Sequence, residues 1–291
     1  MKNPVPRVAA IHDLSGFGRS SLTIVSPILS TMGVQVCPLP TALLSTQTGG
    51  FENYAFFDLT HQMGEIIKHW KSLDIDFQAI YSGFLGSEKQ VEIVSDFIVS
   101  FRGEDTIVLV DPVMGDDGAT YAPIGPFLVS QMRQLVGKAD IITPNFTEAM
   151  LLLDETYHEK TDLKAVKGYL RRLSEMGPRQ VIITSVRTDD TPHISTVVAY
   201  DRDDGRFWKV DCSYIPAFYP GTGDIFASVV VGSILQGDSL PIALDRAVQF
   251  ISVAIRATFG YKIPNREGVL LERVLGNLNI PIVAGSYELI E

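Results

Sequence analysis

The pattern of hydrophobic and polar positions alternates between two periods over the first two thirds of the chain. Short apolar runs alternate with stretches in which apolar residues recur every three or four positions. The first kind predicts β-strands and the second predicts amphipathic helices. The predicted strands are Val5–Ile11, Val34–Leu39, Ala79–Ser82, Thr106–Val110, Ile141–Thr143 and Gln180–Thr184. The predicted helices are Ser20–Met32, capped by Ser20 or Ser21, Leu59–Trp70, one from near Ser87 to Phe101, and Thr161–Met176.

This order of elements predicts a three-layer α/β/α sandwich with a mostly parallel central sheet. Alternating βαβα units bring parallel strands together through right-handed crossovers. The strand Thr106–Val110 is almost wholly apolar, as is typical of a sheet covered on both faces. Late in the chain, Asp203-Asp204-Gly205 between Ser195–Tyr200 and Arg206–Ser213 predicts an antiparallel hairpin. Helices are predicted after it at Asp224–Leu235, Pro241–Thr258 and Glu267–Asn277.

The chain shows no linker and no internal repeat. We therefore predict one domain over residues 1–291, with about 278–291 as a C-terminal tail. No stretch approaches the ~20 apolar residues that span a bilayer, and Val8–Ile11 is too short for a signal peptide. Cys37 and Cys212 match no metal-binding spacing, which favours a reducing compartment. We expect a cytoplasmic protein without a membrane partner.

The net charge of −10 limits the partners of the protein. A negative field repels phosphate backbones, so nucleic acid is not expected as a partner. Any phosphate ligand would need helix N-termini, loop amides or bound cations. The five histidines are scattered with no pair at ligand spacing, and we interpret each as a surface or packing residue.

Ligands of open parallel sheets bind at the carboxyl ends of the strands. The residues that follow the predicted strands are small, polar or acidic, and six such segments converge on one edge of the sheet. These segments are Asp13-Leu14-Ser15-Gly16, Thr46-Gln47-Thr48-Gly49-Gly50, Ser82-Gly83-Phe84-Leu85-Gly86, Asp111-Pro112-Val113-Met114-Gly115-Asp116, Thr143-Pro144-Asn145 and Thr184-Ser185.

The segment Pro220-Gly221-Thr222-Gly223-Asp224 precedes an apolar helix. Its glycines allow successive amides to point into one concavity, and the helix start adds free amides and a positive dipole end. Such a site suits the charge on a phosphoryl group in transfer, and Asp224 could accept a proton from a substrate hydroxyl. The same residues also fit a tight turn followed by an aspartate in a first helical turn.

Asp111 and Glu148 can each be explained in two ways, by a function or by local structure. Asp111 follows a buried strand, where a carboxylate needs a cation or donors, so it fits either a magnesium or phosphate role or a loop cap. Asn145 and Glu148 have the spacing of a capping box, which would explain both residues structurally. Asp116 could belong to the same electrostatic site, whereas Asp117 fits a solvated turn better.

Two familiar nucleotide motifs fail. Gly16-Phe17-Gly18-Arg19-Ser20-Ser21 lacks the third glycine of a dinucleotide fingerprint, and no acidic residue ends the second strand. The Walker phosphate loop and the protein-kinase signature set are absent from the sequence. A nicotinamide-dependent oxidoreductase is therefore a distant alternative, and a kinase would need another ATP-binding device.

Three segments together resemble the ribokinase superfamily: Pro220–Asp224, Asp111–Asp116 and Thr143–Glu148. Within it, Ser82–Ser87 and Leu44–Gly49 make the chain similar to the pyridoxal/pyridoxamine kinase family, over about Val8 to Leu278. The resemblance implies a ribokinase-like fold without the lid domain of sugar kinases. It also implies a homodimer and ATP-dependent phosphorylation of the 5′-hydroxyl of pyridoxal, pyridoxamine or pyridoxine.

The resemblance also implies roles for residues. Asp224 would be the catalytic base, and the amides of Gly221, Thr222 and Gly223 would form the anion hole. Asp13, Thr48 and Asp224 would contact the substrate. ATP contacts would fall on Asp111, Thr143, Glu148 and Thr184, with Asp111 and Glu148 near Mg²⁺, and a monovalent cation is a further candidate cofactor.

The chain departs from the family at two substrate positions. Many members carry serine in place of Asp13 and an Asn-His pair in place of Thr46-Gln47. An aspartate could pair with a protonated ring nitrogen or aminomethyl group, or it could change the specificity. Two alternatives therefore remain: a hydroxymethylpyrimidine kinase, and a non-catalytic vitamer-binding protein on the same scaffold.

Overall fold

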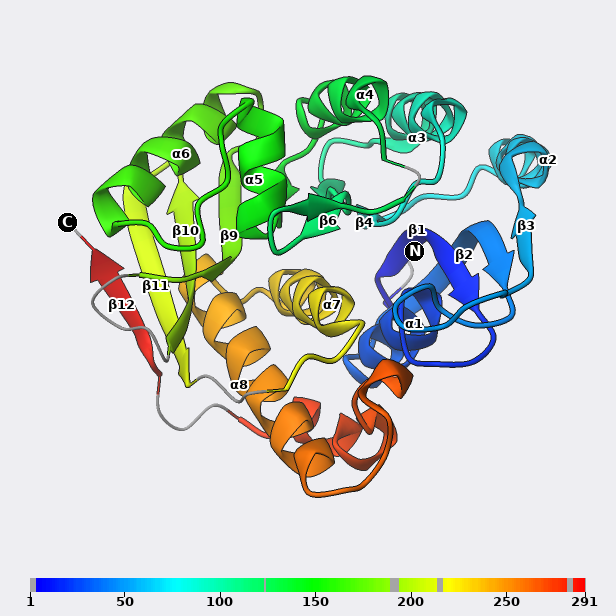
Figure 1. The fold of residues 1–291 in the computed structure, drawn as a ribbon. Coiled ribbons are helices and arrows are strands. Elements are labelled where there is room, and N and C mark those ends of the chain that lie inside the picture. The colour runs from blue at the N-terminus through cyan, green and yellow to red at the C-terminus, as the bar shows by residue number, and fades with distance from the viewer. Residues whose placement is uncertain (1–3, 123, 189–193, 214–216, 282–284, 291) are drawn as a thin grey trace.

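A ten-stranded sheet forms the centre of the fold (Figure 1). The computed structural model describes residues 4–122, 124–188, 194–213, 217–281 and 285–290. The strand order is β12-β11-β10-β9-β8-β5-β4-β1-β2-β3. These strands are β1 Arg7–Ser15, β2 Gln35–Leu44, β3 Phe56–Asp58, β4 Ala79–Ser82, β5 Ile107–Val110, β8 Ile141–Ile142, β9 Gln180–Val186, β10 Ile194–Asp201, β11 Arg206–Ser213 and β12 Tyr287–Ile290. A separate pair is formed by β6 Gly115–Asp116 and β7 Ala119–Thr120.

The strand directions confirm the predicted sheet. From β2 through β1, β4, β5 and β8 to β9, every pairing is parallel. The late hairpin is β10 and β11, and it adds to β9 in the antiparallel direction. β3 and β12 close the two ends of the sheet by antiparallel pairing with β2 and β11. The parallel centre therefore presents the carboxyl ends of six strands at one edge.

Helices cover both faces of the sheet, as predicted. Figure 1 shows α1, α7 and α8 on one side and α3 to α6 on the other. The helices are α1 Leu22–Thr31, α2 Thr60–Ser72, α3 Glu88–Phe101, α4 Pro126–Val136, α5 Phe146–Leu153, α6 Leu163–Glu175, α7 Thr222–Leu235 and α8 Leu240–Phe259. The structure thus has the three-layer α/β/α arrangement expected from the sequence.

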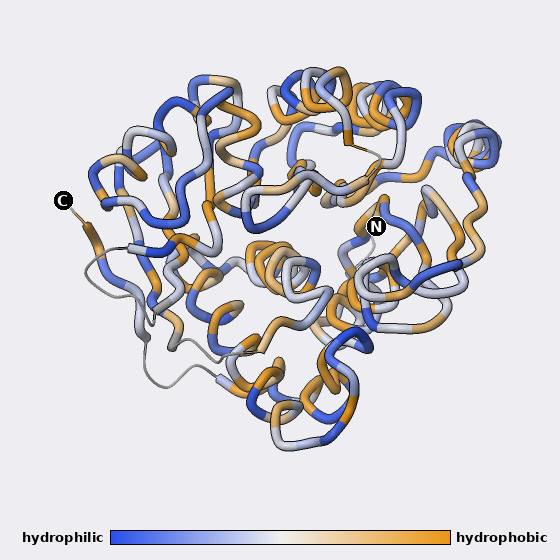
Figure 2. The backbone as a smooth tube through the Cα atoms, in the orientation of Figure 1, coloured by the Kyte–Doolittle hydropathy of each residue, from blue (hydrophilic) through white to orange (hydrophobic). Residues whose placement is uncertain are grey.

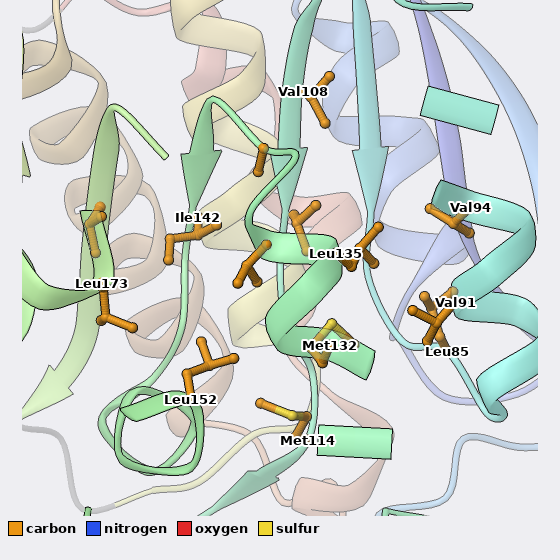
Figure 3. Packing of buried hydrophobic residues seen from close by; sticks show 14 of the residues in the cluster. Leu85, Val91, Val94, Val108, Met114, Met132, Leu135, Ile142, Leu152 and Leu173 are labelled. Atoms are coloured by element: carbon orange, nitrogen blue, oxygen red, sulfur yellow. The ribbon is translucent and has the colours of Figure 1, made fainter. Parts of the chain in front are cut away.

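Each side of the sheet has its own hydrophobic core. Between the sheet and α2 to α6, residues such as Val108, Ile142 and Met132 pack together (Figure 3). On the other face, α7 is apolar around most of its circumference, as Figure 2 shows by its colour. Ile225 to Ser233 are all buried because α1 and α8 flank this helix on the sheet. The start of α7 is thereby fixed relative to the strands.

The C-terminal region differs from its prediction. In place of one helix over Glu267–Asn277, the structure has three 3₁₀ helices, Asn265–Glu267, Leu271–Arg273 and Leu275–Asn279. Gly268 has φ 77°, a left-handed conformation that ends the first of them. The predicted tail includes β12. Within the described residues, no helix is both long and apolar enough to cross a membrane.

Gly232 marks the closest approach of α7 to the residue that follows α1. A Cβ atom placed at Gly232 would lie 2.4 Å from Sδ of the buried Met32. We expect Gly232→Ala to lower the free energy of unfolding by about 1–3 kcal/mol because it overpacks this contact. Gly168 in α6 has no atom within 4 Å of such a Cβ. As the matched control, Gly168→Ala should raise stability by about 0.5–1 kcal/mol through helix propensity. Urea unfolding measures both, and an unchanged or higher stability of Gly232→Ala would contradict the packing argument.

Candidate active site

Asp224 lies in the first turn of α7, beside the carboxyl end of β1. Its Oδ2 accepts a hydrogen bond from the backbone N–H of Ser21 at 2.8 Å, and only 14% of its side chain is exposed. Burial raises the pKa of Asp224 to about 7, against the effect of the Ser21 N–H bond and with a further rise from the charge of Asp13. A carboxyl group with a pKa near neutrality is suited to accept a proton under working conditions.

The N-terminal turn of α7 has the geometry expected of an anion-binding site. Gly221 is the N-cap residue and has φ 85°, so its conformation favours glycine. A Cβ atom there would lie 2.5 Å from the Arg19 carbonyl oxygen and 2.4 Å from Cδ1 of Ile24. Gly223 is exposed, and a Cβ atom there would meet nothing within 4 Å. Because the first four amides of a helix have no partner within it, α7 itself does not use the N–H groups of Gly221, Thr222 and Gly223.

Asp13 sits at an irregularity in β1. The register between β1 and β2 shifts between His12 and Leu14, which is the signature of a β-bulge. Asp13 is buried, and its carboxylate accepts hydrogen bonds from the hydroxyl groups of Ser15 and Ser21. Burial raises the pKa of Asp13, and these two bonds oppose the rise. The bulge therefore holds a second carboxylate close to Asp224.

Asp111 and Glu148 form an acidic pair. Both are buried, Asp111 directly after β5 and Glu148 in the first turn of α5. Burial, and next the charge of Asp224, raise the pKa of Asp111 to about 8. Burial, and next the charge of Asp111, raise the pKa of Glu148 well above its usual range. Since each carboxylate disfavours the charge of the next, this end of the sheet would bind a cation or a proton favourably.

The capping box at α5 is present, as its spacing indicated. Asn145 accepts from the Glu148 N–H, and Glu148 Oε2 accepts from the Asn145 N–H at 2.8 Å. Glu148 Oε1 accepts a third bond, from the Met114 N–H at 3.0 Å. The structural explanation of Glu148 is therefore correct, and the same carboxylate also lies close enough to Asp111 for the charge of Asp111 to raise its pKa. Asp116 is half-buried, and Asp117 is exposed in a turn with φ 45°.

The threonines of the expected site lie at the same edge of the sheet. Thr143 is buried after β8, where its hydroxyl group opposes the rise in the pKa of Asp111. Thr184 is half-buried in β9, and its N–H donates to the Pro144 carbonyl. Thr48 is exposed in the loop after β2. The roles of these three residues in ATP or substrate binding stay predictions.

The side chain of Gln47 makes its hydrogen bonds to the backbone of its own loop and to Arg266. Its amide nitrogen donates to the carbonyl groups of Gly49 and Arg266, and its amide oxygen accepts from the Gly49 N–H. The side chain is buried and shapes the loop that carries Thr48.

Two residues of the site were not found from the sequence. Ser20 or Ser21 was expected to cap α1, and Ser21 is the N-cap residue, but its side chain makes no capping bond. Its hydroxyl group donates to Asp13 and its N–H to Asp224, so it joins the two carboxylates. Its φ of 49° is a strained conformation for serine, of the kind found at functional sites. His12, expected to be a surface or packing residue, is fully buried with Nδ1 4.0 Å from Asp224 Oδ1. The sequence gives no signal for either role, because both depend on α7.

The acidic residues do not form a ready metal cage. Within the residues described, no group of three or more His, Cys, Asp and Glu side chains could hold a metal ion by itself. Mg²⁺ is usually bound by one or two carboxylates together with substrate phosphates and water. The oxygen donors of Asp111 and Glu148 fit that mode.

Comparison with known proteins identifies the family. The phosphomethylpyrimidine kinase family matches residues 28–267. The chain belongs to this family. Two crystal forms of a putative phosphomethylpyrimidine kinase from Bacteroides thetaiotaomicron are 56% and 57% identical, with TM-scores of 0.97 and 0.95. They cover 100% and 98% of this chain and 99% and 100% of their own, and the second contains pyridoxal.

A pyridoxal kinase from Lactobacillus plantarum extends the comparison. It is 30% identical over 95% of this chain and 97% of its own, with a TM-score of 0.85. The resemblance to pyridoxal/pyridoxamine kinases of the ribokinase superfamily is confirmed, and so are the ribokinase-like fold and the assignment as a kinase.

The buried acidic pair should make the ligand-free kinase less stable as the pH rises. The folded state holds the proton of Asp111 more tightly than the unfolded chain does, because folding raises its pKa from 3.8 to about 8. The free energy of unfolding therefore falls as the pH rises from about 4 to about 8. Asp111→Asn stays neutral, so it should be more stable than the wild type by at least about 1 kcal/mol at pH 8, with a smaller difference at pH 5.

Denaturant unfolding of both proteins at the two pH values measures this difference. Asp96 is exposed on α3, and Asp96→Asn is the matched control for the loss of one carboxylate from the surface. A variant Asp111→Asn that is less stable than the wild type at pH 8 would show that the charge of Asp111 is already compensated.

Proposed function

We propose that this kinase transfers the γ-phosphoryl group of ATP to the 5′-hydroxyl of pyridoxal, pyridoxamine or pyridoxine, giving the 5′-phosphate in vitamin B6 salvage. The observation that carries the proposal is the position of Asp224, a largely buried carboxylate next to the free amides of α7. A proton acceptor and an anion site meet there, as transfer to a hydroxyl group requires. The pyridoxal in the Bacteroides structure and the pyridoxal kinase from Lactobacillus plantarum support the choice of substrate.

The residues of the chain account for the steps of the transfer. Asp224 accepts the proton of the 5′-hydroxyl as its O–H bond breaks, and the oxygen forms a new bond to the γ-phosphorus. The bond between that phosphorus and the bridging oxygen of ADP breaks in the same in-line displacement. The amides of Gly221, Thr222 and Gly223 stabilise the negative charge on the transferring group. Catalysis is therefore mainly positioning and electrostatics.

Mg²⁺ fits the acidic side of the site. The raised pKa values of Asp111 and Glu148 reflect burial and mutual repulsion, which a divalent cation would relieve. When bound with ATP, Mg²⁺ would neutralise phosphate charge that the protein, with its net charge of −10, otherwise repels. Thr143 and Thr184 are proposed to contact the nucleotide, and a monovalent cation remains a candidate.

Asp13 is proposed to recognise the vitamer. Its carboxylate is held by Ser15 and Ser21 on the same side as Asp224. A protonated pyridine nitrogen or an aminomethyl group would satisfy its charge, and Thr48 would contact the ring from the exposed loop. Hydroxymethylpyrimidine is the competing acceptor, because the matching family and the Bacteroides relatives carry the phosphomethylpyrimidine kinase name.

Removal of the proposed base should separate binding from turnover. We expect Asp224→Asn to lower kcat by about 10²-fold or more, because the amide cannot accept the hydroxyl proton. Binding of the vitamer should persist. The measurement is ADP formation with pyridoxal, pyridoxamine, pyridoxine and hydroxymethylpyrimidine in parallel, with vitamer binding followed by calorimetry. Asp203 is exposed at the tip of the late hairpin, and Asp203→Asn is the matched control with unchanged rates.

The same assay separates the alternatives. Phosphorylation of hydroxymethylpyrimidine in preference to the B6 vitamers would replace the proposed substrate. Tight pyridoxal binding without ADP formation by the wild type would indicate a vitamer-binding protein. Near wild-type turnover of Asp224→Asn would overturn the assignment of the base.

We also propose that two copies associate through the β3 end of the sheet. β3 ends the described sheet, and all three of its residues are exposed. Phe57 is 60% exposed, Phe56 47% and Leu43 41%, so apolar side chains line this edge. Exposed apolar patches of this kind commonly mark interfaces.

The dimer can be tested by size. Light scattering after gel filtration should give about twice the 32.0 kDa of one chain. Phe57→Asp should shift the protein toward the monomer, because a charge would be buried at the interface. Phe127, which is 63% exposed on α4, offers the matched control, since Phe127→Asp should stay dimeric. A wild-type monomer at micromolar concentration would contradict the proposal.

The single domain and the location in the cell are also proposed. The two cores share one sheet, which supports a single kinase domain over the chain. The sequence holds only two cysteines, Cys37 and Cys212, far apart and without metal-binding spacing, which supports a cytoplasmic enzyme.

A further inference from the structure

His12 is a buried polar side chain whose ring atoms are not satisfied. It lies near the end of β1 with no exposed surface, and neither Nδ1 nor Nε2 has a hydrogen-bond partner. Buried polar groups in proteins are nearly always hydrogen-bonded, so such a residue needs an explanation. The reaction proposed above does not use it.

Packing fixes the place of the ring. The edge of His12 meets the ring of Tyr81 in β4, with centroids 4.3 Å apart and planes at 77°. On another side, Gly83 leaves room for it, because a Cβ atom at Gly83 would lie 2.3 Å from Nδ1. The imidazole is thus packed against β4 and the glycine that follows it.

The proposed base lies close to Nδ1. Nδ1 lies 4.0 Å from Asp224 Oδ1, while Asp224 Oδ2 is already held by the Ser21 N–H. At 4.0 Å the two atoms are not yet hydrogen-bonded. Catalytic hydrogen bonds are often long in ligand-free enzymes and shorten only in the reaction complex, directly or through one water molecule.

We propose that His12 is a positioning residue for Asp224, whose neutral imidazole donates from Nδ1 to Oδ1 in the reaction complex. The proposal rests on the proposed kinase reaction. The Ser21 N–H and His12 would then hold one carboxylate oxygen each. The remaining lone pairs of the carboxylate are left to face the substrate hydroxyl group.

The imidazole of His12 is suited to act as an uncharged hydrogen-bond donor. Burial lowers the pKa of His12 to about 3, so the imidazole carries no charge at neutral pH and does not compete for the substrate proton. The titratable groups around Asp224 are His12 and Asp13 on β1, Tyr81 on β4, Asp111 after β5 and Tyr121 after β7. The charge of Asp13 raises the pKa of Asp224, and Asp224 and Asp111 repel each other. A hydrogen bond donated by His12 would lower the pKa of Asp224.

The test compares His12→Phe with His12→Asn. Phenylalanine keeps an aromatic ring against Tyr81 and removes both nitrogens, whereas the asparagine amide nitrogen takes about the place of Nδ1. We expect His12→Phe to lower kcat about 10-fold, the size of a hydrogen bond to a charged group. The acidic limb of the kcat profile should move to higher pH by about one unit, with KM for both substrates little changed. His12→Asn should recover most of the rate and the position of the limb, and His69→Gln, an exposed change on α2, should alter neither.

The proposal would be overturned if His12→Phe and His12→Asn lowered kcat equally and left the acidic limb of the pH profile in place. His12 would then be a packing residue only. If His12→Phe fails to fold, Gly83→Ala replaces it, because its Cβ would displace the ring and leave residue 12 intact. The same shift of the limb is then expected, and a wild-type profile would overturn the proposal.

A carbon NMR titration of the Asp224 carboxyl group keeps this proposal separate from the proposed function. It follows the pKa of Asp224 without turnover, in the wild type and in His12→Phe or its replacement, each saturated with pyridoxal. A higher pKa in the variant supports the role of His12 even if no vitamer is phosphorylated. An equal pKa overturns it even if the kinase reaction is established.

Discussion

Mutual repulsion among buried carboxylates is the constraint on which the rest of this structure depends. Asp13, Asp111, Glu148 and Asp224 lie at one edge of the sheet, each largely removed from water. Their pKa values rise because burial disfavours the charged form and because neighbouring carboxylates repel one another. The fold tolerates this cost by donating backbone and hydroxyl hydrogen bonds from Ser21, Ser15, Met114 and Asn145. This repulsion makes the folded protein less stable, and it also makes the site one that would bind a cation or a proton favourably.

The parallel sheet explains why these residues meet. Crossover connections return each strand in the same direction, so Asp13, Asp111 and Thr143 arrive at one edge although long stretches of sequence separate them. α7, which comes much later in the sequence, brings its first amides and Asp224 to the same edge. Because α7 is apolar on nearly all sides and packed between α1, α8 and the sheet, its first turn has little freedom to move. The precision of the site comes from this packing.

The sequence predicts what depends on local pattern, and it misses what depends on long-range contacts. The parallel strands, the late hairpin and most helices follow from hydrophobic periodicity and turn residues. The capping box at Asn145 and Glu148 is likewise a local feature, and it is present. By contrast, the sequence indicates only a helix cap at Ser21. In the structure its hydroxyl group donates to Asp13, 8 residues away, and its N–H to Asp224, 203 residues away. His12 has no local signal, because only α7 gives its ring a polar neighbour. The helix expected over Glu267–Asn277 fails because Gly268 adopts a left-handed conformation where it packs against Arg19.

The carbonyl group of Arg19 joins three distant segments. Added Cβ atoms at Gly221 and at Gly268 would lie 2.5 Å and 2.9 Å from its oxygen, so the start of α7 and the 3₁₀ region both close on the loop before α1. The anion site therefore needs residues near both ends of the chain. During synthesis on the ribosome, the strands and the early helices can pack long before residue 268 emerges. The turn at the start of α7 can then complete its packing only after residue 268 has emerged, so a nascent kinase would have its parallel strands in place well before this turn.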